Sequence, residues 1–168
     1  MLIPNVRRTW APRGQTPIVR HRYRRDKVSA ISAVTVSPER RRFGLYLHLH
    51  PGENITTVEV AIFLRTLLRH LRGHVIVLLD GGSIHKGPEV QALEARCPRL
   101  HLAWFPGYAP ELNPDEWVWA HFKGKLANGH PNTLDDLMGD LSRISKSVTT
   151  RRDLIRSFIT GSELPSFL

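Results

Sequence analysis

The chain has 168 residues, enough for one domain with a substantial core and too few to expect two. Apolar residues make up 41% and charged residues 23%, which argues against wholesale disorder. The single cysteine, Cys97, excludes an internal disulfide, and the longest strongly apolar runs are about five residues, far below the roughly 20 that cross a bilayer. With no apolar stretch of secretory length at the N-terminus, a cytoplasmic protein is expected.

Positive charge is concentrated at the start of the chain. The net charge is +9, and residues 1–27 hold eight lysines and arginines against one acid, Asp26. Such a segment favours a polyanionic partner, because neutralising phosphates releases counterions. A solvated basic tail is the alternative.

The first half of the chain predicts a turn, a hairpin and a helix. Residues 10–17, rich in Pro and Gly, indicate a turn between short extended pieces. Lys27–Val36 and Phe43–His50 alternate around a break at 37–40, which predicts an antiparallel hairpin. Thr56 or Thr57 can then cap an amphipathic helix that reaches about Arg72, with Gly73 as a stop.

Strands and helices alternate in the second half. Val75–Leu79 is a short continuous apolar run, typical of a strand covered on both faces, and Leu100–Trp104 is a second strand. The remaining segments predict helices at Pro88–Arg96, from Pro114 to Ala127, and in two amphipathic patterns around Leu134–Ile144 and Leu154–Ile159. This order predicts an α/β fold with a mixed central sheet and flanking helices.

Asp80 directly follows the apolar strand 75–79. Ligands of open α/β sheets collect beyond the carboxyl ends of the strands, so an acid at this position is well placed to hold a cation. The alternative is an Asp that caps the turn Gly81–Lys86 or the next helix. His85, in that turn, either orients Asp80, contacts phosphate, or is an ordinary hydrogen-bonded surface residue.

Glu116 lies early in the helix that Asn113 caps and Pro114 begins. At the third helical position a Glu commonly folds back on the backbone of the cap, which is the structural alternative. Helical spacing places Val118, Phe122 and Leu126 on a buried stripe, however, and Glu116 on another face with Lys123. Glu116 can therefore face a site, and Lys123 can contact a nucleic-acid backbone.

Two carboxylates of this kind suit Mg²⁺ or Mn²⁺, which prefer oxygen ligands and support phosphodiester displacement. Zinc is not favoured, since His48 and His50 alternate along one strand face and the sequence has neither a cysteine pair nor a His-Glu-x-x-His pattern.

Three segments together resemble the catalytic domain of DDE-superfamily transposases, in the bacterial insertion-sequence branch related to mariner elements. They are Trp10-Ala-Pro-Arg-Gly-Gln-Thr-Pro17, Leu79-Asp-Gly-Gly-Ser-Ile-His-Lys86 and Tyr108-Ala-Pro-Glu-Leu-Asn-Pro-Asp-Glu-Trp-Val-Trp119, the last followed by Phe122-Lys123. The resemblance covers nearly the whole chain. It implies an RNase H-like fold in which three acids hold two Mg²⁺ or Mn²⁺ ions that cleave DNA ends and drive strand transfer.

By this resemblance, Asp80 matches the second acid of the family and Glu116 the third. Arg13, His85, Lys86, Asn113 and Lys123 are expected to contact DNA or to support the metal ligands. The partners expected are transposon ends and target DNA, in a bacterial, nucleoid-associated setting.

The chain also departs from the family pattern. The family's first Asp lies on a strand shortly before the Trp-Ala-Pro segment, whereas Met1 stands nine residues before Trp10 with no acid between. The usual Asn after the second acid is Gly81, and no helix-turn-helix precedes. Asp26 is better explained as an ion-pair partner of its neighbouring arginines than as a replacement ligand.

These departures predict an N-terminally truncated or interrupted reading frame with weak or absent catalysis. The first catalytic strand would be missing, residues 1–128 would form a partial catalytic domain, and residues 129–168 a helical extension packed on it. An upstream fragment, or a second copy in a homodimer, would be the protein partner. A DNA-binding or oligomerising remnant without catalysis is the alternative function, and a host nuclease on the same fold is a third.

Overall fold

The computed structural model describes residues 7–18, 27–129, 131 and 133–164. Its first elements are β1 (Val28–Val36) and β2 (Phe43–Pro51), an antiparallel pair in register from Val28 opposite Pro51 to Val36 opposite Phe43. The predicted hairpin is thereby confirmed. The basic positions 20, 22, 24 and 25 and the acid Asp26 lie outside the described residues.

Helix α1 (Thr57–His70) is capped by Thr56, one of the two predicted caps. The Thr56 hydroxyl accepts a hydrogen bond from the Val58 N–H, and the Glu59 carboxylate accepts one from the Thr56 N–H. One face of the helix is buried and consists of Val60, Ala61, Phe63, Leu64, Leu67 and Leu68. The helix ends at His70, two residues before the predicted end, and Gly73 at φ +73° turns the chain into the next strand.

A β-α-β unit follows. β3 (Val75–Leu79) pairs in parallel with β4 (Leu100–Trp104), and α2 (Pro88–Arg96) crosses between them. Two single-turn 3₁₀ helices interrupt the loops, η1 (Ser83–His85) and η2 (Pro110–Leu112). The boundaries of both strands and of α2 agree with the prediction.

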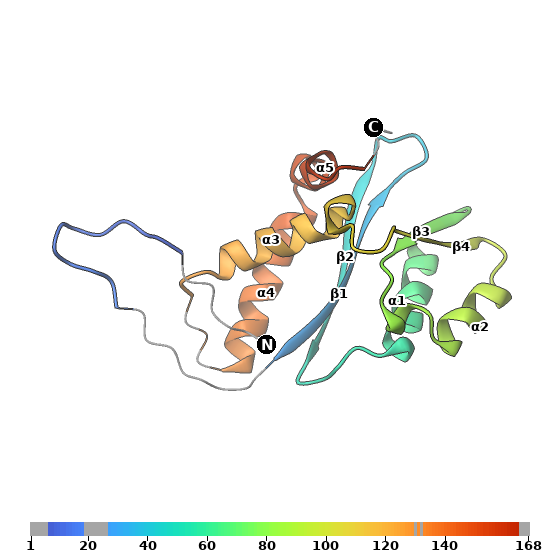
Figure 1. Cartoon of the computed structure of the whole chain (residues 1–168), viewed down its shortest axis with the longest axis horizontal. Helices are drawn as coiled ribbons and strands as arrows, with labels where there is room; N and C mark the ends of the chain where they lie inside the picture. Colours follow the sequence, from blue (N-terminus) through green and yellow to red (C-terminus); the bar gives the residue numbers. More distant parts are fainter. Residues whose placement is uncertain (1–6, 19–26, 130, 132, 165–168) are drawn as a thin grey trace.

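Three helices close the chain: α3 (Pro114–Leu126), α4 (Leu134–Thr149) and α5 (Arg152–Gly161). They lie on one side of the hairpin, while α1, α2 and the parallel pair lie on the other (Figure 1). No helix among the described residues is long and apolar enough to cross a membrane.

The hairpin separates two hydrophobic cores. One contains Val118 and Phe122 of α3, packed with Leu45 of β2 and buried residues of α4 and α5. In the other, the buried face of α1 packs against Ile31 of β1 and also against Val77 of β3. Helix α1 therefore covers one face of both strand pairs.

The prediction that β3 is covered on both faces was wrong. The side chains of Ile76 and Leu78 are 72% and 46% exposed, because α1 and α2 cover only the opposite face. Among the described residues, the strands form two separate two-stranded sheets, β1-β2 and β3-β4, rather than one continuous central sheet. The fold is thus α/β with antiparallel and parallel pairs held together by helices.

Removing the Phe122 side chain tests the packing of α3. Phe122 is 1% exposed, so Phe122→Ala is expected to lower the free energy of unfolding by about 3–5 kcal/mol in urea denaturation. The nearby exposed Lys125→Ala should change it by no more than about 0.5 kcal/mol. Equal stability of the two variants would show that α3 is not anchored by this core.

Candidate active site

Asp80 emerges from the carboxyl end of β3 with a side chain that is 62% exposed. Its Oδ1 accepts a hydrogen bond from the Gly82 N–H at 2.9 Å and lies 3.2 Å from Nε2 of His85. Its Oδ2 has no hydrogen-bond partner among the described residues. Oδ1 of Asp80 therefore caps the turn, as the alternative interpretation predicted, and Oδ2 is available to bind a ligand.

The turn after Asp80 is shaped around its carboxylate. A Cβ at position 82 would lie 2.9 Å from Asp80 Oδ1 and 3.3 Å from the His85 ring, so only glycine fits there without a shift. At Gly81, a Cβ would meet nothing within 4 Å. Gly81 thus leaves open space beside the carboxylate.

His85 lies under the turn, with a side chain only 15% exposed. Burial lowers the pKa of its imidazole, and the Asp80 carboxylate opposes that shift. The ring is therefore mainly neutral at neutral pH, with Nε2 toward Asp80. His85 Nδ1 is buried and has no partner among the described residues.

Lys86 and Trp104 meet at the carboxyl ends of the parallel strands. The ammonium of Lys86 lies 5.2 Å from the centroid of the Trp104 ring, within the range of a cation–π contact. Trp104 is 43% exposed. This contact keeps a cation and an aromatic surface beside the turn that carries Asp80.

A backbone bond links this strand end to the segment that leads to α3. The Phe105 N–H donates to the carbonyl of Leu79, the residue before Asp80, at 2.8 Å. The segment that starts at Phe105 ends at Asn113. As predicted, Asn113 caps α3: its side-chain oxygen accepts a hydrogen bond from the Asp115 N–H at 3.0 Å. The loop from β4 to α3 thus begins beside the residue before Asp80 and ends at the helix that carries Glu116.

Glu116 is exposed, and Val118 and Phe122 are fully buried, as the helical spacing predicts. The Glu116 carboxylate makes no hydrogen bond or ion pair with any described residue, so it does not fold back on the cap. Lys123 is exposed on the same helix. Glu116 is therefore free to bind a ligand from solvent.

Asp115 was not predicted from the sequence as a residue of this region. Its carboxylate is largely buried and accepts hydrogen bonds from Ser32 of β1 and from the Trp119 indole, the latter at 3.0 Å. Burial raises the pKa of Asp115, a shift opposed by these hydrogen bonds and reinforced by the neighbouring Glu116 charge. Helical spacing was the available signal, since positions 115, 118 and 122 share one stripe.

Arg13 lies apart from this region, on the segment 7–18 that extends away from the packed elements (Figure 1). The segment is exposed throughout, and Trp10 is 100% exposed. It is tied to the end of α3 at Arg7, whose N–H and carbonyl each bond the Asn128 side chain at 3.0 Å.

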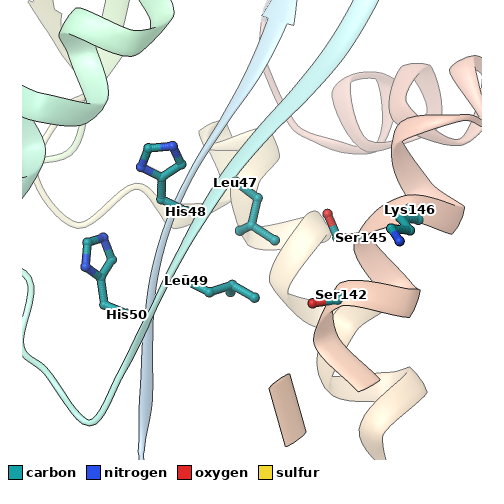
Figure 2. A pocket seen from close by; sticks show the side chains of 7 residues that line it. All are labelled: Leu47, His48, Leu49, His50, Ser142, Ser145 and Lys146. Atoms are coloured by element: carbon teal, nitrogen blue, oxygen red, sulfur yellow. The ribbon is translucent and has the colours of Figure 1, made fainter. Parts of the chain in front are cut away.

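A shallow pocket of about 400 Å³ lies elsewhere, between β2 and α4. Leu47 and Leu49 face Ser142 and Ser145 of α4, whereas the His48 and His50 rings both point to the other side of the strand (Figure 2). The shared face of the two histidines agrees with the predicted alternation. No carboxylate lines this pocket, so it is not a cation site.

The described residues include no cluster of three or more His, Cys, Asp or Glu side chains able to hold a metal ion. Asp80 at the strand end and Glu116 on α3 are the exposed acids of this region, whereas Asp115, the other acid of α3, accepts hydrogen bonds from Ser32 and Trp119. Asp80 and Glu116 are both oxygen donors without a cation partner among the described residues, which is the chemistry that Mg²⁺ or Mn²⁺ requires.

Comparison with known families identifies the chain. The model of the DDE superfamily endonuclease family matches residues 2–138. The chain belongs to this family. A search of curated proteins found no match.

Solved structures support the same fold class. The Mos1 mariner paired-end complex with Mn has a TM-score of 0.63 at 20% identity, over 94% of this chain and 47% of that chain. The Mos1 transposase paired-end complex with the left transposon end has a TM-score of 0.64 at 19% identity, and the match covers 95% of this chain and 47% of that chain. The catalytic domain of Mos1 mariner transposase has a TM-score of 0.56 at 17% identity, and the match covers 80% of this chain and 74% of that chain.

These matches confirm the predicted RNase H-like α/β fold. The chain spans about half the length of the two paired-end complex chains.

Asp115→Asn tests the electrostatics beside Glu116. The pKa of the Asp115 carboxyl is raised in the folded state. The free energy of unfolding of the wild type therefore falls as the pH rises from the pKa of this carboxyl in the unfolded chain through its pKa in the folded chain. Asn keeps an acceptor for Ser32 and Trp119 but does not ionise. In urea denaturation from about pH 4 to neutral, the variant should therefore gain stability relative to the wild type as pH rises. A difference independent of pH would contradict the raised pKa.

Proposed function

We propose that this chain is the catalytic domain of a transposase of bacterial insertion-sequence type, and that it cleaves and joins DNA phosphodiesters with Mg²⁺ or Mn²⁺. Asp80 and Glu116 are the proposed catalytic residues and metal ligands. The observation that carries the proposal is the presence of two exposed carboxylates, one directly after β3 and one in the first turn of α3, neither with a cation partner among the described residues. Such a protein would act at the bacterial nucleoid.

The donor set fits a hard divalent ion. Asp80 offers Oδ2, and Glu116 offers a carboxylate with no hydrogen bond to a described residue. A bound ion of this kind supplies charge neutralisation at the reacting phosphate and a more acidic attacking hydroxyl. His85, mainly neutral, holds Asp80 in place rather than competing with the ion for it.

Basic and aromatic side chains around the site and on the segment 7–18 are the proposed DNA contacts. Lys86 lies over Trp104 beside Asp80, and Lys123 shares the exposed part of α3 with Glu116. Arg8 and Arg13 stand with Trp10 on the exposed segment, tied to α3 through Asn128. Cations interleaved with aromatic rings suit a phosphate backbone and its bases. One Mos1 transposase structure of similar fold is a paired-end complex with the left transposon end.

A further strand would complete both the sheet and the ligand set. Among the described elements, every strand has only one neighbour, and α1 packs against both pairs. Open strand edges readily accept another strand. We propose that a segment from another chain, either a complementing fragment or a second copy, pairs there and brings a third acidic ligand.

Cleavage of supercoiled DNA tests the catalytic proposal. Because the described residues supply two of the three expected acidic ligands, the purified chain should nick DNA slowly with Mg²⁺ or Mn²⁺. Asp80→Ala and Glu116→Ala should each lower that nicking at least about tenfold, since both are proposed to hold the ion. Asp153→Ala, an exposed acid of α5, is the matched control.

Metal-dependent nicking that survives both substitutions would refute the site. Strong nicking lost in both variants would confirm the site and refute the incomplete ligand set. The alternative function, DNA binding without catalysis, predicts no metal-dependent nicking and DNA affinity that is unchanged by Asp80→Ala.

The salt dependence of DNA binding tests the segment 7–18. Each phosphate contact contributes about 0.9 to the slope of log K against log salt. Arg8→Ala and Arg13→Ala should therefore each lower the slope by about 1 in fluorescence anisotropy titrations. Arg143→Ala removes an arginine that pairs with Asp140 on α4 and should leave the slope unchanged. Equal slopes in all variants would exclude these arginines as phosphate contacts.

A further inference from the structure

Tyr108 combines a fully exposed side chain with a strained backbone. Its relative exposure is 106%, and its φ is +58°, in the left-handed region. Bulky residues rarely adopt this region, where Gly and Asn are tolerated best. A residue held in this conformation at the surface points to a function that uses its side chain.

The other two described non-glycine residues with positive φ have structural reasons for it. Arg40, at +56°, lies in the tight turn between β1 and β2, where its N–H donates to the Ser37 carbonyl at 2.8 Å. Asn128, at +60°, bonds both backbone groups of Arg7. The Tyr108 side chain, in contrast, makes no hydrogen bond or ring contact with any described residue.

Tyr108 stands in the loop between β4 and α3. That loop begins at Phe105, bonded to the carbonyl of Leu79 next to Asp80, and continues through η2 to the helix of Glu116. Trp104, with Lys86 over its ring, immediately precedes the loop. Tyr108 is thus exposed on a loop that starts beside the residue before Asp80 and ends at the helix of Glu116.

We propose that the ring of Tyr108 stacks on an unpaired base of the DNA strand whose backbone lies at Asp80 and Glu116. This rests on the proposed function. An exposed aromatic ring provides a stacking platform that accepts any base, and neighbouring lysines neutralise the backbone. Stacking uses the ring face and needs no hydroxyl, so Phe can replace Tyr at this position. The site would therefore favour DNA with an unpaired end over fully paired DNA.

Three substitutions separate stacking from backbone strain, the first of which, Tyr108→Ala, removes the ring without the freedom of glycine at positive φ. Tyr108→Gly relieves the positive φ and removes the ring, whereas Tyr108→Phe keeps both. The probes are a blunt DNA duplex and the same duplex with a short single-stranded overhang that carries a fluorescent adenine analogue, whose emission falls when the base stacks. The control is Ile62→Ala, which shortens a 47% exposed side chain on α1.

Tyr108→Ala and Tyr108→Gly should each weaken binding of the overhang duplex by roughly 5- to 150-fold and abolish the quenching. Tyr108→Phe and Ile62→Ala should behave as the wild type, and all variants should bind the blunt duplex equally. Wild-type affinity and quenching in Tyr108→Gly would overturn the proposal. Loss of quenching in Tyr108→Phe would also overturn it, since the hydroxyl would then be required.

The test distinguishes failure of this inference from failure of the proposed function. A wild-type chain that binds neither duplex refutes the DNA-acting function and the inference with it. A wild-type chain that binds both duplexes without dependence on Tyr108 refutes the inference alone. Self-association that is lost in Tyr108→Gly, with unchanged DNA binding, would assign the ring to a contact between copies and overturn stacking.

Discussion

The burial of Val118 and Phe122 fixes the rotation of α3, and the position of Glu116 depends on that rotation. Both side chains are at most 1% exposed and pack in the core shared by the hairpin, α4 and α5. Asp115 adds a polar anchor through its hydrogen bonds to Ser32 and Trp119. With one face of the helix held in this way, Glu116 has to face solvent.

Electrostatics then distinguish the acids near the loop. Asp80 shares one oxygen with a backbone N–H and His85, Glu116 has no hydrogen-bond partner among the described residues, and Asp115 is buried with a raised pKa. Burial is the main cause of that raised pKa of Asp115, and repulsion by the neighbouring Glu116 charge adds to it. A divalent cation relieves such repulsion. The site is thus better suited to an ion than to a closed network of ion pairs.

Local patterns in the sequence predicted most of the elements. Alternation gave the hairpin, Thr56 and Asn113 gave helix starts, and the Gly73 and Asn128 regions gave their ends. The exposure of Ile76 and the division into two sheets were not predictable, because a continuous apolar run does not reveal which faces other elements cover. The role of Asp115 depended on Ser32, more than eighty positions away, and the strain at Tyr108 on a backbone angle. Helical spacing places Asp115 on the buried stripe of α3, but it does not reveal the Ser32 partner, and no sequence pattern reveals the positive φ of Tyr108.

Anomalous diffraction from crystals grown with Mn²⁺ tests the central claim most directly, because it locates the ion without relying on turnover. We expect an anomalous peak that marks one Mn²⁺ ion, with Oδ2 of Asp80 and a carboxylate oxygen of Glu116 each at roughly 2.0–2.2 Å from the ion. The peak should be absent from crystals of Glu116→Ala. A peak at the His74–His101 pair, whose ring nitrogens are 2.9 Å apart, with none at the two carboxylates would contradict the claim.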